Sequence, residues 1–207
     1  MSEYQDYGYN NADADHSFYY LREPLKGLLH KNMTILDLGC GNGYITNYLI
    51  DDGYKAYGTD ASEKGIAIAA GKNPGRFFVQ DLSTDELPEG LRNIRFDTVI
   101  STEVIEHLYD PEQFIRTCRR ILTDSNGNLI ISTPYHGYLK NLMLAVFNKW
   151  DTHLDPLWRG GHIKIWSKAT LTRILEQNGF KVVAFKGCGR WPWFWKSMII
   201  KAVLADA

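Results

Sequence analysis

The sequence predicts a doubly wound α/β fold, in which helices cover both faces of a mostly parallel sheet. Short apolar runs of strand length alternate with segments of helical periodicity along the chain. The runs are apolar at nearly every position, which is typical of strands buried on both faces. With 207 residues, of which 44% are hydrophobic and 23% charged, the chain fits one globular domain. We therefore expect residues 1–207 to form a single domain.

Six apolar runs are predicted as strands of the parallel sheet, because each has strand length and lies between helical segments. These runs are Met33–Leu38, Lys55–Gly58, Arg76–Gln80, Phe96–Ser101, Asn128–Ser132 and Lys181–Lys186.

Four segments between these runs are predicted as helices, since each has helical spacing and recognisable ends. Ser62 is suited to an N-cap, Pro111 to a first turn, and Gly179 to a C-terminal stop. The predicted helices are Tyr44–Asp52, Ser62–Ala70, Pro111–Leu122 and Ser167–Gln177.

Two segments depart from the simple alternation. Residues 1–31 are predicted as an N-terminal helical cap over the ligand cleft, with a helix over His16–His30 that Pro24 interrupts or restarts. Residues 134–166 form a long insert between a strand and a helix, and contain the apolar helical stretch Leu139–Phe147. Because loops of this length inside compact domains are usually functional, the insert is predicted as a lid or substrate-binding element.

Composition and charge exclude several classes of protein. The formal net charge of -1 provides no global attraction to nucleic acid. The three cysteines lack C-x-x-C spacing, which favours reduced thiols in a cytoplasmic protein over a zinc cluster. We expect neither a secretory signal nor a membrane-spanning segment. All six tryptophans lie in the last third, so the aromatic segment 190–207 is predicted to form a binding wall or an interface.

The segment from Asp37 to Gly43 is the most informative part of the chain, because glycines occupy alternate positions between a buried strand and a helix. In an open α/β sheet a ligand lies beyond the carboxyl ends of the strands, where glycines allow close approach of the backbone. The spacing is G-x-G-x-G and not the G-x-G-x-x-G of dinucleotide sites, which weakens a pyrophosphate interpretation. The structural alternative is a tight turn that binds nothing.

Two aspartates follow the next two predicted strands. Asp60 is placed to accept hydrogen bonds from both hydroxyls of a ribose, and Asp81 to accept from an adenine amine. Each could instead be an ordinary helix cap, but the glycine turn and both aspartates in this order predict a nucleoside pocket.

Glu103, Glu106 and His107 follow the fourth predicted strand at the same edge of the sheet. Their spacing of three and four residues places them on one face if this turn is helical. Such a face suits a divalent cation. Alternatively, a histidine here acts as a general base or holds a loop.

Together with the run from Phe96 to Leu108, these motifs resemble the class I S-adenosylmethionine-dependent methyltransferases, and among them the ubiquinone-pathway O-methyltransferases. The resemblance implies a Rossmann-like sheet of seven strands, in which the seventh strand is antiparallel. Ser197–Leu204 is the candidate for this strand, although its sequence fits a helix nearly as well. It also implies S-adenosylmethionine as the cofactor. The cofactor-binding residues implied by the resemblance are Asp37, Gly39, Gly41, Gly43, Asp60, Ala61, Asp81, Leu82 and Thr102.

The acidic cluster resembles that of two methyltransferase groups, the ubiquinone-pathway enzymes and the small-RNA 3′-terminal 2′-O-methyltransferases. This resemblance implies Mg²⁺ or another divalent cation bound by Glu103, Glu106, His107 and His162. In the competing interpretation His107 or His162 is the general base, with Glu106 beside it.

The resemblance implies O-methylation of a small-molecule, lipid-like or sugar hydroxyl. The alternatives are an RNA 2′-O-methyltransferase, for which the sequence offers few basic phosphate contacts, and a non-catalytic regulator that binds S-adenosylmethionine. The stretch Leu139–Trp150 has two interpretations. The favoured one is a buried lid helix over an apolar pocket, and the second is an interfacial helix that gives peripheral contact with a membrane.

Overall fold

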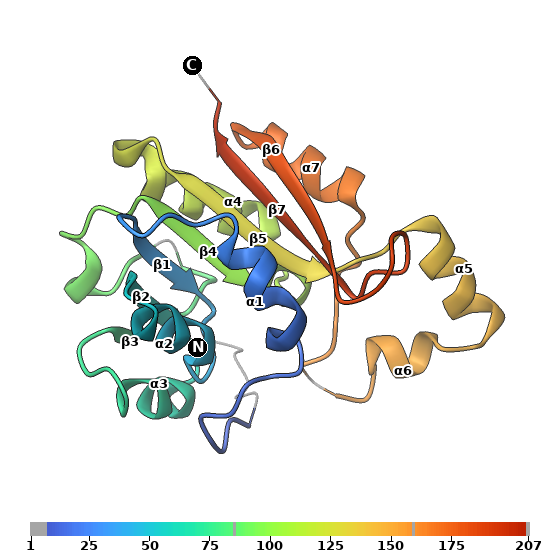
Figure 1. Cartoon of the computed structure of the whole chain (residues 1–207), viewed down its shortest axis with the longest axis horizontal. Coiled ribbons are helices and arrows are strands. Elements are labelled where there is room, and N and C mark those ends of the chain that lie inside the picture. The colour runs from blue at the N-terminus through green and yellow to red at the C-terminus, as the bar shows by residue number, and fades with distance from the viewer. Residues whose placement is uncertain (1–7, 85, 159, 206–207) are drawn as a thin grey trace.

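A computed structural model describes residues 8–84, 86–158 and 160–205, and within these ranges it has one seven-stranded sheet in the order β3-β2-β1-β4-β5-β7-β6 (Figure 1). The pairs among β1 to β5 are parallel, whereas β7 is antiparallel to both β5 and β6. The strands are β1 (Thr34–Leu38), β2 (Lys55–Asp60), β3 (Phe77–Val79), β4 (Thr98–Thr102), β5 (Asn128–Pro134), β6 (Phe180–Cys188) and β7 (Ser197–Leu204).

The helices cover both faces of the sheet, as the fold class predicts. They are α1 (Phe18–Lys26), α2 (Tyr44–Asp51), α3 (Glu63–Ala70), α4 (Pro111–Leu122), α5 (Tyr138–Val146), α6 (Trp150–Leu154) and α7 (Lys168–Gln177), with short 3-10 turns η1 (Glu89–Leu91), η2 (Ile105–His107) and η3 (Thr123–Ser125).

Successive side chains of each central strand enter different cores. In β1, Leu36 and Leu38 join the core beneath α4 and α7, whereas Ile35 joins the core beneath α1 and α2 (Figure 1). Both faces of the strand are therefore buried, which explains why the sequences of these strands are continuously apolar and do not alternate between apolar and polar residues.

The predicted elements agree with the observed ones to within two residues in the core of the fold. Helix α4 has the predicted bounds because its ends are encoded locally: Pro111 begins the helix, and the Asp110 carboxylate accepts a 2.9 Å hydrogen bond from the backbone N–H of Gln113. The Ser62 side chain likewise caps α3, accepting from Gly65 N at 3.0 Å.

The candidate seventh strand, Ser197–Leu204, is a strand and not a helix. It lies between β5 and β6, so β6 and not β7 is the edge of the sheet. Met198 and Ile200 join one core and Ile199 the other, which explains the unbroken apolar run that made this segment ambiguous.

The N-terminal helix is shorter than the predicted His16–His30, and Pro24 does not interrupt it. Pro24 lies in the last turn of α1, where its missing N–H removes one helical hydrogen bond, and the bond from Gly27 N to Glu23 O at 3.0 Å continues the helix beyond it.

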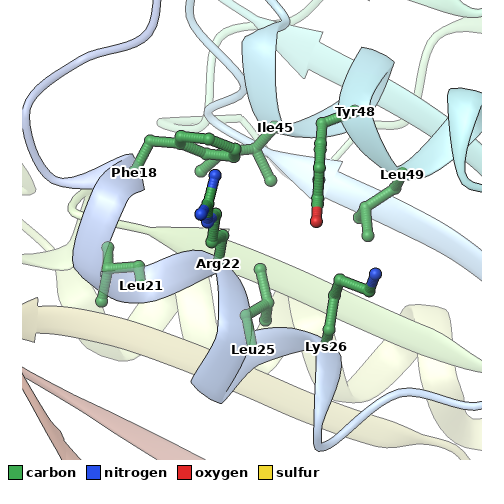
Figure 2. A pocket seen from close by; sticks show the side chains of 8 residues that line it. All are labelled: Phe18, Leu21, Arg22, Leu25, Lys26, Ile45, Tyr48 and Leu49. Carbon is green, nitrogen blue, oxygen red and sulfur yellow. The ribbon is translucent and has the colours of Figure 1, made fainter.

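Helix α1 is held against α2 by aromatic contacts (Figure 2). The Phe18 ring packs edge-on against Tyr44 and Tyr48, with centroid distances of 4.7 and 5.1 Å. Arg22 and Lys26 lie over the rings of Phe18 and Tyr48 at 5.7 and 5.5 Å. The crevice between the helices has no interior space for a water molecule, so it serves packing and not ligand binding.

In the part of the chain that the structure describes, no helix is long and apolar enough to cross a membrane.

Candidate functional site

A cleft of about 1760 Å³ lies over the carboxyl ends of the parallel strands. It is lined by the turn after β1, the ends of β2 and β4, the insert with α5 and α6, and the segment between β6 and β7. The sequence-predicted site residues that line it are Gly39, Gly41, Asp60, Ala61, Asp81, Leu82, Thr102, Glu103, Glu106, His107 and His162.

The glycine turn presents bare backbone to this cleft. Gly39 and Gly41 have φ angles of +80° and +57°, which side chains rarely adopt. A Cβ on Gly39 would lie 2.5 Å from a methyl carbon of Val104, and one on Gly41 would lie 2.5 Å from the hydroxyl oxygen of Tyr9. Both glycines are therefore required by conformation and by close packing.

Asp37 and Gly43 are not among the residues that line the cleft. Asp37 is fully buried and accepts a 2.7 Å hydrogen bond from the hydroxyl of Thr46, and burial raises its pKa to about 7. Gly43 begins α2 with φ +73°, and a Cβ there would lie 2.3 Å from Ala69 Cβ. These two residues position the start of α2 behind the glycine turn.

Asp60 connects the first two loops of the site. One carboxylate oxygen accepts from Gly41 N and the other from Ser62 N, each at 2.8 Å. Asp60 is 8% exposed and lines the cleft. Asp81 also lines it, and accepts from Ser83 N at 2.9 Å.

The N-terminal segment contributes residues that the sequence analysis missed. Tyr9 lines the cleft and lies against Gly41 and Gly65. The Asn42 side-chain amide donates to the carbonyls of Asn11 and Asp13 at 3.1 and 2.8 Å, which ties this segment to the glycine turn. The only feature of the sequence that could have indicated this role is the high tyrosine content of the N-terminal segment, which was predicted only as a helical cap.

Glu103 does not share a helical face with Glu106 and His107, which corrects that expectation. It follows β4 directly and has φ +54°, so the chain turns at Glu103 before η2 begins at Ile105. Its two carboxylate oxygens accept from the hydroxyls of Ser132 and Ser197 at 2.7 and 2.9 Å. Burial raises the pKa of Glu103 to about 7.

Glu106, His107 and His162 do come together, with one potential ligand atom from each lying within 4.8 Å of the others. Glu106 is 1% exposed, and its Oε2 accepts a 2.9 Å hydrogen bond from the Thr133 hydroxyl. Its Oε1 has no hydrogen-bond partner among the described residues and lies 3.9 Å from His107 Nε2. Burial, and then the charge of Glu103, raise the pKa of Glu106 well above its usual range, which favours the protonated carboxyl.

The return of the chain at Gly161 sets the orientation of His107. Its Nδ1 lies 3.3 Å from the Gly161 carbonyl oxygen, and since that oxygen only accepts, Nδ1 carries the proton in the neutral ring. The backbone of Gly160 also contacts the imidazole. Burial lowers the pKa of His107, so the neutral ring is favoured.

His162 lies beside His107 because its loop is tied to η2. The backbone N–H groups of Ile163 and Lys164 donate to the Glu106 carbonyl oxygen at 3.0 and 2.9 Å. The rings of His107 and His162 have centroids 5.0 Å apart. Burial, followed by the charges of His107, His136 and Lys140, lowers the pKa of His162 to about 4.

The insert over 134–166 forms the other wall of the cleft. Helix α5 has no buried residue. Met143 and Leu144 on the helix and Phe147 after it line the cleft, and Leu142, Met143, Val146 and Phe147 are all exposed. Helix α5 is therefore not the fully buried helix that the favoured interpretation of this stretch describes.

A pair of histidines connects α6 to the end of β5. The Nε2 atoms of His136 and His153 lie 3.3 Å apart, and the His136 ring stacks on Trp150 with a centroid distance of 6.0 Å.

Comparison with known protein families gives a match to a methyltransferase domain model over residues 13–184. Among curated proteins, the chain is 32% identical over 185 residues to the human mitochondrial ubiquinone biosynthesis O-methyltransferase, with 83% of this chain and 48% of that protein covered. It is 30% identical over 173 residues to a probable S-adenosylmethionine-dependent methyltransferase of Mycolicibacterium smegmatis, with 82% and 62% covered. The chain thus spans between about half and two thirds of the length of these relatives.

Solved structures share the fold. A protein from Pyrococcus horikoshii matches with a TM-score of 0.70 at 21% identity, covering 95% of this chain and 94% of that one. The magnesium protoporphyrin IX methyltransferase of Synechocystis with bound SAH (S-adenosylhomocysteine) matches with a TM-score of 0.64 at 24% identity, covering 89% and 80%.

Proposed function

Since the chain belongs to the class I S-adenosylmethionine-dependent methyltransferase family, we propose that it transfers a methyl group from this cofactor to a hydroxyl oxygen of a small-molecule acceptor. The observation that carries the choice of a hydroxyl is the position of His107, because its ring lines the cleft and burial lowers its pKa, so that the neutral imidazole suited to a general base is favoured.

The cofactor half of the cleft is the part around the glycine turn. Gly39 and Gly41 contribute backbone without side chains to this wall, and the carboxylates of Asp60 and Asp81 line the same cleft, which fits an adenosine with its ribose hydroxyls. Ala61, Leu82 and Thr102 complete this wall. When bound, the cofactor supplies an electrophilic methyl group on a sulfonium.

With the methyl group supplied, the chain has to orient the acceptor, remove its proton and exclude water. His107 Nε2 accepts the hydroxyl proton as the oxygen attacks, and the Gly161 carbonyl stabilises the resulting imidazolium through Nδ1–H. Glu106 lies beside Nε2 as a buried carboxyl whose raised pKa favours the neutral form, so it does not hold the imidazole in its protonated form through an ion pair. The names of the curated relatives support oxygen as the methylated atom.

A second candidate mechanism uses a divalent cation held by Glu106, His107 and His162. The observation in its favour is the unpartnered Oε1 of Glu106, which lies near both rings. Mg²⁺ prefers oxygen ligands, whereas two imidazoles and one carboxylate suit a first-row transition ion such as Mn²⁺ or Fe²⁺ better.

The insert over 134–166 is the proposed acceptor lid of this single methyltransferase domain, which is supported by the cleft-lining side chains Met143, Leu144 and Phe147. Leu142 and Val146, which are exposed and do not line the cleft, are the apolar side chains of α5 that a membrane would contact if the acceptor is lipid-like.

The test combines cofactor binding with turnover. S-adenosylhomocysteine is expected to raise the melting temperature by mass action, whereas NAD⁺ should not. Methyl transfer from radiolabelled cofactor into fractionated cell extract, followed by mass analysis of the product, identifies the acceptor and the methylated atom. A larger shift with NAD⁺ would contradict the proposed cofactor.

Chelation separates the two mechanisms. Turnover that persists after exhaustive treatment with EDTA but is reduced at least a hundredfold in His107→Ala supports the base mechanism. Loss of turnover on chelation, restored by Mn²⁺ while cofactor affinity stays unchanged, would instead support the metal.

A further inference from the structure

Several basic side chains line the part of the cleft that the insert and the segment between β6 and β7 contribute. Asp60 and Asp81 lie in the proposed cofactor half, at the ends of β2 and β3. Lys140 on α5, together with Arg190 and Lys196 from the segment between β6 and β7, lines the wall contributed by the insert and that segment. This second wall faces the space left for the acceptor.

Lys140 is the central member of this basic wall. Its Nζ donates a 3.1 Å hydrogen bond to the carbonyl oxygen of Lys196, which leaves two further N–H donors. The side chain is half-buried, and burial lowers its pKa to about 8; the nearby charge of Arg190 acts in the same direction, and that of Glu103 opposes both.

Within the described ranges the side chains of the basic wall form no ion pair, although the charge of Glu103 acts on Lys140 from a longer distance. None of Lys140, Arg190 and Lys196 forms an ion pair within 4.0 Å there, whereas Lys26, Lys31 and Lys72 on the outer surface do. Lys196 is partly engaged, with its Nζ 2.7 Å from His16 Nε2. A half-buried ammonium beside a second cation is unfavourable unless an anion accompanies it.

The same ammonium lies close to the proposed reaction centre. Lys140 lines the same cleft as His153 and His162, and its charge contributes to lowering the pKa of both. A group bound at Lys140 therefore belongs to the molecule whose hydroxyl reaches His107.

From this arrangement we infer that the acceptor carries an oxyanion, either a carboxylate or a phosphate, which Lys140 and Arg190 bind while the hydroxyl lies at His107. The inference rests on the proposed function and narrows its substrate class. Charge-assisted hydrogen bonds from these two side chains replace the missing carboxylate partners and fix the acceptor at one end. A purely structural role of Lys140, holding α5 to the Lys196 carbonyl, is the competing explanation.

Three probes that differ in charge test the inference by calorimetry on protein saturated with S-adenosylhomocysteine. These are 3,4-dihydroxybenzoate, 2-hydroxyphenyl phosphate and the neutral 3,4-dihydroxybenzamide. At least one anionic probe is expected to bind about 10-fold or more tightly than the amide, the value for a hydrogen bond to a charged group. A preference for the benzoate identifies a carboxylate acceptor, and a preference for the phosphate a phosphorylated one.

Variants connect that preference to the basic wall. Lys140→Gln retains a donor for the Lys196 carbonyl but removes the charge, and combined with Arg190→Gln it should bring the affinity ratio between the anionic probe and the amide to about one. Lys140→Gln alone should reduce this ratio severalfold, whereas Lys140→Arg should keep it. Lys181→Gln, on the exposed side of β6, is the matched control and should change nothing.

The inference is wrong if no anionic probe binds, if the amide binds as tightly, or if the preference is unchanged in Lys140→Gln. Binding of S-adenosylhomocysteine itself reports on the proposed function. Its failure would therefore be distinguished from a failure of the anion preference alone.

Discussion

The Thr133 hydroxyl donates a 2.9 Å hydrogen bond to Oε2 of Glu106, and this bond joins the end of β5 to the turn that follows β4. Thr133 is fully buried and Glu106 is 1% exposed. A carboxyl so deeply buried depends on this donor, since its other oxygen has no partner among the described residues. The bond therefore fixes the orientation of the carboxyl beside His107.

Thr133→Val should lower the free energy of unfolding by about 1–3 kcal/mol, because it removes the hydroxyl that donates to Oε2 of the buried Glu106 carboxyl. Denaturant unfolding at neutral pH measures this loss. Thr59→Val is the matched control: Thr59 is also fully buried, but its hydroxyl has no hydrogen-bond partner among the described residues, so little or no loss is expected. Equal losses in the two variants would contradict the assignment.

Gly41→Ala should weaken binding of S-adenosylhomocysteine about 10-fold or more, because the new methyl group meets the Tyr9 hydroxyl at 2.5 Å and disturbs the wall of the cofactor half. Calorimetric titration gives the dissociation constant. Gly75→Ala carries the same left-handed strain, with φ +75°, but nothing lies within 4 Å of its Cβ. It should lose some stability and no affinity, and a similar loss of affinity in both would mean that the cofactor binds elsewhere.

Asp60→Asn should weaken the same binding by about 1–3 kcal/mol. The amide cannot accept from Gly41 N and Ser62 N while also accepting from both ribose hydroxyls. Asp124→Asn, at an exposed position in η3, should leave the affinity unchanged. Unchanged affinity in Asp60→Asn would remove Asp60 from the cofactor site.

His136 should make the protein less stable as the pH falls. Burial lowers its pKa from 6.5 to about 4, so between these values the unfolded chain binds a proton that the folded chain does not. Its contribution to stability is therefore complete above pH 6.5 and is lost on acidification toward pH 4, by about 3 kcal/mol. The raised pKa values of Asp37 and Glu103 act in the opposite direction.

Because of those opposing groups, the measurement compares the native protein with His136→Gln. The difference in unfolding free energy at pH 7.5 gives the packing cost of losing the ring. That difference should shrink as the pH is lowered to 5, since the variant has no imidazole to protonate. A difference that stays constant with pH would contradict the lowered pKa of His136.

Features encoded within a few residues of the chain were predictable from the sequence. The ends of α4 follow from Asp110 and Pro111, and the turn after β1 from Gly39 and Gly41, because caps and left-handed glycines act over one turn of chain. The placement of Asp60 at the cleft followed from the rule that the carboxyl ends of parallel strands meet at one edge of the sheet.

The tertiary structure decided what depends on residues distant in sequence. Glu103 departs from the acidic cluster because Ser132 and Ser197, supplied by β5 and β7, bind its carboxylate. The basic wall exists because α5 and the segment before β7 meet across the cleft, a contact that no local pattern records. The chain by itself thus determined its elements and the cofactor loop, whereas the environment of each acidic and basic side chain was set by long-range packing, since charges interact through space and not along the sequence.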